Sequence, residues 1–184
     1  TVRIVGQLAA ARVNVEFLEF KEKIGKGGAL LEGFSHCITE LVSFVDADES
    51  TSPHDLDGLV NVISSNDGVI GSRKLEASII LVPQSFLRRF LSRCFNVLVN
   101  ALFSLGYRDT QCGAKVFRRE TLLRVLPEMH STGFEFDVEL LWRLRRINAV
   151  IIEYPITWKH SVGSTFRLSQ IPKMLMGLVR IRFF

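Results

Sequence analysis

The chain has 184 residues, of which 47% are hydrophobic and 23% are charged. This composition excludes a disordered chain, and the length suits one domain with a sizeable core. The net charge is only +4, but the arginines are concentrated in short segments, which favours phosphate groups or an anionic membrane surface as partners. Base-stacking aromatic residues are not interleaved with these arginines, so we expect no nucleic acid as a partner.

The three cysteines are widely spaced and form no Cys-x-x-Cys pair, which is typical of a protein in a reducing compartment. The sequence contains no signal-peptide pattern and no run of eighteen or more uncharged apolar residues that could span a bilayer. We therefore expect any membrane contact of this segment to be peripheral. These features favour the cytoplasmic face of the membrane.

Hydrophobic periodicity predicts that helices and strands alternate along the chain. The predicted elements, in order, are a helix over 2–12, a strand over 14–20, a helix over 29–37 after a glycine-rich loop, a strand over 40–45, a helix from Pro53, a strand over 68–71, a helix over 85–105, a strand over 114–117, a helix that Thr132 and Glu135 cap and that runs to about Ile147, a strand over 149–154, and an amphipathic helix over 168–184. This alternation predicts an α/β sandwich with a mostly parallel sheet. We expect residues 1–166 to form the domain and 167–184 a helix that faces a membrane.

Two carboxylates follow an apolar strand in the segment Asp46-Ala47-Asp48. Alternate side chains of extended backbone share one side, so Asp46 and Asp48 can converge on one site. Ligands of open α/β sheets bind at the carboxyl ends of strands, and Mg²⁺ or Mn²⁺ prefers carboxylate and phosphate oxygens. The pattern indicates a metal-diphosphate site. The alternative interpretation is a turn before Pro53 with two acidic residues.

The segment Ile24-Gly25-Lys26-Gly27-Gly28 leads into a predicted helix. Free backbone N–H groups at a helix start favour an anion, and Lys26 adds a positive charge. Glycines at such a position also serve tight packing, and the segment matches neither the phosphate-loop nor the dinucleotide-binding pattern. Both interpretations stay open.

A second anion site is indicated by Arg73, which directly follows a predicted buried strand, and by Arg88 and Ser92, which share one face of a helix. The planar guanidinium suits a phosphate, and a serine hydroxyl can donate beside it. The alternative is an ordinary amphipathic helix. Two polar loops, one from Asp109 to Gly113 and one around His160, are typical of loops that take part in binding or catalysis. Each can also be a structural turn whose polar groups are paired within the protein.

Six motifs in this order resemble the polyprenyl-phosphate sugar transferases of glycosyltransferase family 2. They are Gly25-Lys26-Gly27-Gly28, Asp46-Ala47-Asp48, Gly71-Ser72-Arg73, Asp109-Thr110-Gln111-Cys112-Gly113, Phe136-Asp137-Val138-Glu139 and Trp158-Lys159-His160. The resemblance implies a Rossmann-like GT-A fold and an inverting transfer of a hexose from a nucleotide-sugar to dolichyl or another polyprenyl phosphate. The loop from Asp109 favours UDP-glucose as donor, with GDP-mannose next.

The resemblance also implies roles for individual residues. Mg²⁺ or Mn²⁺ is expected on Asp46 and Asp48, and Asp109 is expected beside the transferred sugar. The donor diphosphate is expected at Lys26, Gly27, Asp46, Gln111 and His160, and the acceptor phosphate at Arg73, Arg88 and Ser92.

The sequence departs from the family in two places. Relatives begin with strands that hold the nucleotide base, which we expect to be missing here, and some supply a further metal ligand where this chain has Ser50. Two rival functions follow from the same residues: a nucleotidyltransferase of related fold, which releases pyrophosphate, and a catalytically inactive module that binds membranes.

Overall fold

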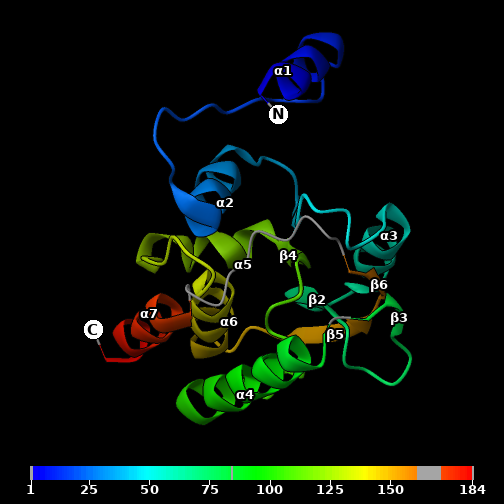
Figure 1. Ribbon diagram of the computed structural model, residues 1–184. Helices are drawn as coiled ribbons and strands as arrows, with labels where there is room; N and C mark the ends of the chain where they lie inside the picture. Colours follow the sequence, from blue (N-terminus) through cyan, green and yellow to red (C-terminus); the bar gives the residue numbers. More distant parts are fainter. Residues whose placement is uncertain (1, 84, 161–170, 184) are drawn as a thin grey trace.

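The computed structural model describes residues 2–83, 85–160 and 171–183 (Figure 1). Its centre is a four-stranded sheet in the order β1-β4-β2-β5, with a separate two-stranded sheet of β3 and β6. The strands are β1 (Leu41–Val45), β2 (Gly68–Ser72), β3 (Ile79–Val82), β4 (Ala114–Arg118), β5 (Ile151–Pro155) and β6 (Thr157–Lys159). Strands β1, β2 and β5 share one direction, whereas β4 runs antiparallel between β1 and β2. The α/β prediction is confirmed, and the reversed β4 was not predicted.

The helices are α1 (Val2–Ala11), α2 (Gly25–His36), α3 (Pro53–Val62), α4 (Phe86–Phe103), α5 (Arg119–Leu123), a 3-10 turn (Leu126–Glu128), α6 (Phe136–Arg146) and α7 (Ile171–Phe183). Strand alternation divides their packing between two clusters. Ile70 and Phe117 pack with α2, α4, α6 and α7, whereas the neighbouring Val69 and Val116 pack with α3. The sheet is therefore covered on both faces, as an α/β sandwich requires.

Helix α1 differs from the other helices because none of its residues is buried. Figure 1 shows it apart from the sheet, joined to α2 by an irregular segment. The strand predicted over 14–20 is wrong, because this segment has no strand structure and pairs with no strand in the described part of the chain. An alternating pattern forms a strand only where a neighbouring strand accepts its backbone hydrogen bonds.

Two predicted helix starts also need correction. Helix α2 begins at Gly25, so the glycine-rich segment is its first turn and not a loop before it. Helix α6 begins at Phe136 without a side-chain cap, and Glu135 instead accepts a hydrogen bond from Gly133 N at 3.3 Å, so the predicted capping box is absent. The amphipathic helix predicted over 168–184 is observed as α7, and residues 161–170 and 184 lie outside the described part.

Candidate active site

A cavity of about 1670 Å³ opens where β1 and β2 end and β4 begins. This is the edge of the sheet at which an α/β fold binds its ligands. The predicted site residues that line it are Lys26, Asp46, Asp48, Arg73, Arg88, Ser92, Gln111 and His160. Segments far apart in the sequence thus contribute to one cavity. Gly27 and Asp109 are not on its wall and are buried behind it.

Asp46 and Asp48 follow β1 directly, and both line the cavity. The Asp46 N–H donates to the Gly113 carbonyl at 2.8 Å, which holds the end of β1 against the start of β4. The Asp48 carboxylate accepts from Ser50 N at 3.1 Å, and Glu49 between them has a left-handed φ of 58°. A Cβ on Gly113 would overlap the Asp46 carboxylate, so any larger residue there would displace that side chain.

This pair of carboxylates suits a divalent cation that also takes ligands from a substrate. In residues 2–83, 85–160 and 171–183, no group of three or more His, Cys, Asp or Glu side chains could hold a metal ion. The described residues therefore do not form a metal site made of protein ligands alone. Mg²⁺ binds in proteins through one or two carboxylates together with phosphate oxygens and water, and Asp46 and Asp48 fit that requirement.

Lys26 contacts one of these carboxylates from the first turn of α2. Its Nζ lies 3.0 Å from Asp46 Oδ1 and 3.0 Å from Asp137 Oδ2, and Lys115 Nζ lies 2.6 Å from the other oxygen of Asp137. Burial opposes the charged form of Lys26, but Asp137 and Asp46 outweigh it and raise its pKa. Burial likewise opposes ionisation of Asp137, and Lys115 and Lys26 lower its pKa. Lys26 and Asp137 are therefore both charged at neutral pH.

Gly27 has a packing role in this turn. Its N–H donates to the Thr132 carbonyl at 3.0 Å, and a Cβ would overlap the Ser131 carbonyl. The N–H of Gly27 is thus already satisfied by the protein, contrary to the expectation that it is free for a phosphate. Ile24, Gly25 and Lys26 of this segment line the cavity, and Lys26 is the residue among them that carries a charge for a phosphate.

Arg73 and Asp109 form a two-pronged ion pair. Arg73 Nε and Nη2 donate to the two oxygens of Asp109 at 2.6 and 2.8 Å, and the Arg73 backbone N–H donates at 3.0 Å. The Arg73 guanidinium also lies 5.4 Å from the centre of the Trp158 ring. Burial of Asp109 opposes its ionisation, but Arg73 outweighs it and lowers the Asp109 pKa to about 2. Asp109 is 1% exposed, so Arg73 and not Asp109 faces the cavity.

Arg88 and Ser92 line the cavity from the first half of α4. Ser85 caps this helix, and its hydroxyl accepts from the Arg88 N–H at 3.4 Å. Sequence reasoning missed two further lysines on the cavity wall, Lys23 before α2 and Lys173 on α7. A ligand for this cavity therefore meets positive charge from α2, α4 and α7.

Two polar side chains on the cavity wall have buried atoms that find no hydrogen-bond partner among the described residues. They are the Ser50 hydroxyl and the Gln111 side-chain nitrogen. Buried polar atoms in folded proteins are usually paired, so such atoms indicate where a ligand can supply the partner. Gln111 was predicted as a donor-binding residue, and Ser50 as a position where the chain departs from the family pattern.

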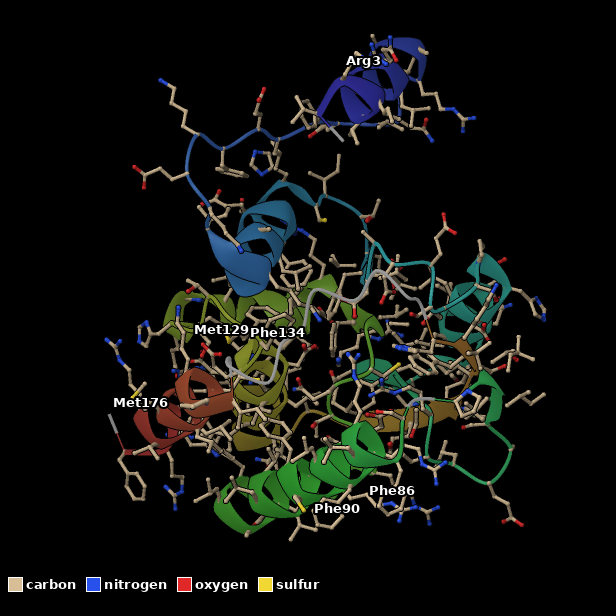
Figure 2. The ribbon with its side chains drawn as sticks, viewed as in Figure 1. Arg3, Phe86, Phe90, Met129, Phe134 and Met176 are labelled. Carbon is tan, nitrogen blue, oxygen red and sulfur yellow. The ribbon has the colours of Figure 1, made fainter. Side chains whose placement is uncertain are left out.

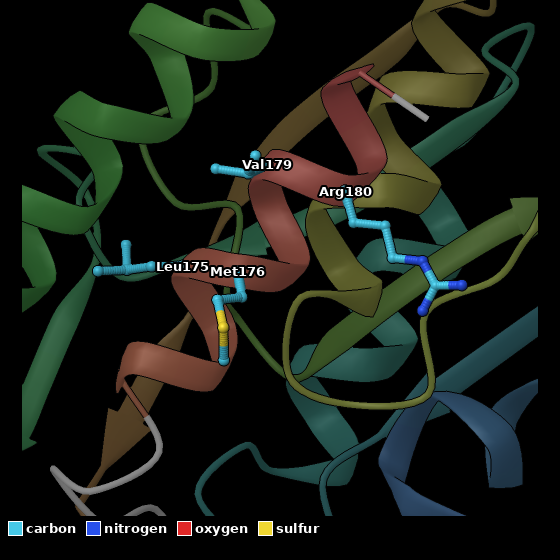
Figure 3. Close-up of a pocket in the computed structure, with 4 residues that line it drawn as sticks. All are labelled: Leu175, Met176, Val179 and Arg180. Atoms are coloured by element: carbon cyan, nitrogen blue, oxygen red, sulfur yellow. The ribbon is translucent and has the colours of Figure 1, made fainter.

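Exposed apolar side chains occur on α4, α7 and β3. Figure 2 shows Phe86 and Phe90 projecting from α4, and these side chains are 80% and 54% exposed. Figure 3 shows Leu175, Met176, Val179 and Arg180 of α7, which line a shallow cavity of about 640 Å³. All four residues of β3 are exposed and apolar. None of the helices in the described ranges has the length and apolar character needed to cross a bilayer.

The fold is a GT-A fold, and the solved structures that share it include the following two. A mycobacterial protein gives a TM-score of 0.63 at 19% identity, over 93% of this chain and 53% of that one. A glucosyl-3-phosphoglycerate synthase from Mycobacterium tuberculosis, in complex with Mn²⁺, uridine diphosphate and phosphoglyceric acid, gives 0.61 at 17% identity, over 85% and 52%.

The chain belongs to glycosyl transferase family 2, whose sequence profile matches residues 1–126. It is 36% identical to a dolichyl-phosphate beta-glucosyltransferase of Dictyostelium discoideum over 92% of this chain and 54% of the relative. It is 33% identical to the protein of the same name from Saccharomyces cerevisiae, over 90% and 54%. The chain thus spans about half the length of the curated relatives it matches. The family resemblance and the GT-A fold predicted from the sequence are confirmed.

Proposed function

We propose that this protein transfers glucose from UDP-glucose to dolichyl phosphate, with inversion, at the cytoplasmic face of a membrane. The observation that carries the proposal is that one cavity combines the carboxylates Asp46 and Asp48 with the cations Lys26, Arg73 and Arg88. The names of the relatives from Dictyostelium and yeast support the sugar and the acceptor. The Mn²⁺ and uridine diphosphate in the glucosyl-3-phosphoglycerate synthase support a metal and a uridine nucleotide.

At the donor end, Lys26 neutralises the diphosphate, and the Gln111 amide and the Ser50 hydroxyl donate to its oxygens or to the sugar. Mg²⁺ or Mn²⁺ bound by Asp46 and Asp48 would stabilise the charge of the departing nucleoside diphosphate. His160 stacks on Trp158 with ring centres 5.7 Å apart, which places an imidazole on the cavity wall as a further donor.

At the acceptor end, Arg88 and Ser92 hold the lipid phosphate beside Arg73. A phosphate dianion is already a nucleophile near neutral pH, so the transfer needs no strong general base. Asp109 is buried and its pKa is about 2, so it serves in this proposal to hold the Arg73 guanidinium at the cavity wall and not as a base. Positioning and charge neutralisation then supply most of the acceleration.

The lipid chain of the acceptor leaves the cavity over apolar surface. Leu87 of α4 and Leu175 of α7 line the cavity itself, and both helices carry further exposed apolar side chains, as does β3. Arginines on α4 and α7 suit the anionic surface of a cytoplasmic leaflet. We therefore propose peripheral contact of this face with the membrane that holds the acceptor.

Incubation of the intact protein with dolichyl phosphate, Mg²⁺ and labelled UDP-glucose or labelled GDP-mannose tests the proposal. We expect label in the lipid fraction from UDP-glucose only, with uridine diphosphate as the second product. Label from GDP-mannose would overturn the donor assignment. Release of pyrophosphate from a nucleoside triphosphate would instead indicate a nucleotidyltransferase, and liposome binding without any transfer would indicate an inactive membrane module.

A further inference from the structure

Alternating charges connect the protein core to the wall of the cavity. Lys115 on β4 is fully buried, Asp137 in the first turn of α6 is 1% exposed, Lys26 on α2 is 21% exposed and Asp46 after β1 is 41% exposed. Successive partners are 2.6, 3.0 and 3.0 Å apart, with one Asp137 oxygen for each lysine. We call these residues the charge relay. Its buried end is Lys115, and its exposed end is Asp46.

The buried end of the relay is fixed. Lys115 Nζ donates to the Cys112 carbonyl at 2.5 Å in addition to Asp137, and it lies 5.3 Å from the centre of the Phe44 ring. Lys26 Nζ lies 5.5 Å from the centre of the same ring. Removing one partner from a buried ion pair is strongly destabilising, so Lys115 and Asp137 are expected to stay paired.

Only Asp46 can change partner at little cost. The charges of the two lysines and two aspartates cancel within the relay. If the Asp46 carboxylate binds another cation, Lys26 keeps its ion pair with Asp137. Lys26 thus stays charged and stays at the cavity wall. Its pair with Asp46 is partly exposed, and such pairs are weak enough to exchange.

We propose that Lys26 is a competing cation that occupies Asp46 in the free protein, held in place by the positioning residue Asp137. A divalent cation alone must displace Lys26 from Asp46. A cation that arrives with a diphosphate offers Lys26 new phosphate partners in exchange. Lys26 therefore couples the binding of the metal to that of the nucleotide, and this coupling rests on the proposed function of Asp46 at a metal-diphosphate site.

Titration of the intact protein with Mn²⁺, followed by the electron paramagnetic resonance signal of free Mn²⁺ with and without uridine diphosphate, tests this proposal. For the wild type we expect weak binding alone and tighter binding with the nucleotide. Lys26→Met should lower the Kd for Mn²⁺ alone by about 3-fold or more and reduce the enhancement by the nucleotide. Lys21→Met is the matched control, because it removes an exposed lysine close in sequence that does not line the cavity. It should leave the enhancement unchanged.

Asp137→Asn should have the opposite effect on Mn²⁺ binding. It leaves Lys26 with Asp46 as its remaining carboxylate partner in the relay, so the Kd for Mn²⁺ should rise. If Asp137 served folding alone, the Kd for Mn²⁺ would not fall in Lys26→Met and rise in Asp137→Asn. Circular dichroism must first show that the Asp137 variant is folded, and if it is not, the partly exposed Lys26 variant decides the matter.

The failures of the two proposals are distinguishable. If the wild type binds Mn²⁺ but Lys26→Met shifts neither the Kd nor the enhancement, the competition is refuted while the metal-diphosphate site stands. If the wild type binds no Mn²⁺ even with uridine diphosphate, the metal part of the proposed function is overturned and the competition with it.

Discussion

The ion pair of Arg73 and Asp109 allows a prediction with a magnitude. Lowering the Asp109 pKa from 3.8 to about 2 corresponds to about 2 kcal/mol of stability at neutral pH. Asp109→Asn keeps the shape of the side chain but leaves the Arg73 guanidinium without its carboxylate, and such a loss costs about 3 kcal/mol. We therefore expect the free energy of unfolding to fall by about 2–3 kcal/mol at pH 7.

The pH dependence gives a second test of the same pair. Because the pKa of Asp109 is lowered by folding, its contribution is complete well above pH 4 and is lost as the pH falls towards 2. Other buried carboxylates such as Asp137 also lose stabilisation in acid, so the difference between wild type and Asp109→Asn isolates the pair. This difference should shrink as the pH falls through this range.

Urea unfolding followed by circular dichroism measures these free energies. The matched control is Glu40→Gln, because Glu40 pairs with Arg118 at 2.6 Å but its side chain is 81% exposed. That substitution should cost less than about 1 kcal/mol. A loss below about 1 kcal/mol for Asp109→Asn, or a loss that does not vary between pH 7 and pH 3, would refute the reasoning.

Three further predictions concern transfer and binding. Asp48→Asn should reduce sugar transfer at least about 100-fold with an unchanged unfolding midpoint, and undiminished turnover in a metal chelator would contradict it. Arg88→Ala should raise the KM for dolichyl phosphate far more than the KM for the donor, whereas Arg89→Ala, off the cavity wall, should change neither. Gly113→Ala should push the Asp46 carboxylate aside and weaken Mn²⁺ binding, as a titration would show.

Much of the fold follows from short-range patterns. The predicted helices and most of the sheet strands form because apolar periodicity and local breakers such as Pro53 act over a few residues. The direction of β4 is not encoded in this way, since Ala114–Phe117 reads the same whichever way the strand enters the sheet. The segment 14–20 shows the converse, because its alternation has no effect without a neighbouring strand.

The candidate site was predicted in outline because its motifs are contiguous. Asp46 and Asp48 are two residues apart, and Arg88 and Ser92 are one helical turn apart. The pairing of Arg73 with Asp109 joins residues 36 positions apart, and that of Lys26 with Asp137 joins residues 111 apart. A local sequence pattern cannot predict pairs between residues so far apart in the chain. The one available signal was a lysine, Lys115, in an otherwise apolar strand.

A buried carboxylate fixes a cation at each proposed end of the cavity. Asp137 holds Lys26 at the donor end and Asp109 holds Arg73 at the acceptor end, so the protein positions both cations before any ligand binds. Helix α4, which carries Arg88 at the acceptor end, also exposes the apolar residues Phe86 and Phe90. Preorganised cations suit the phosphates of both substrates. A helix with an apolar outer face suits a phosphate delivered from a bilayer.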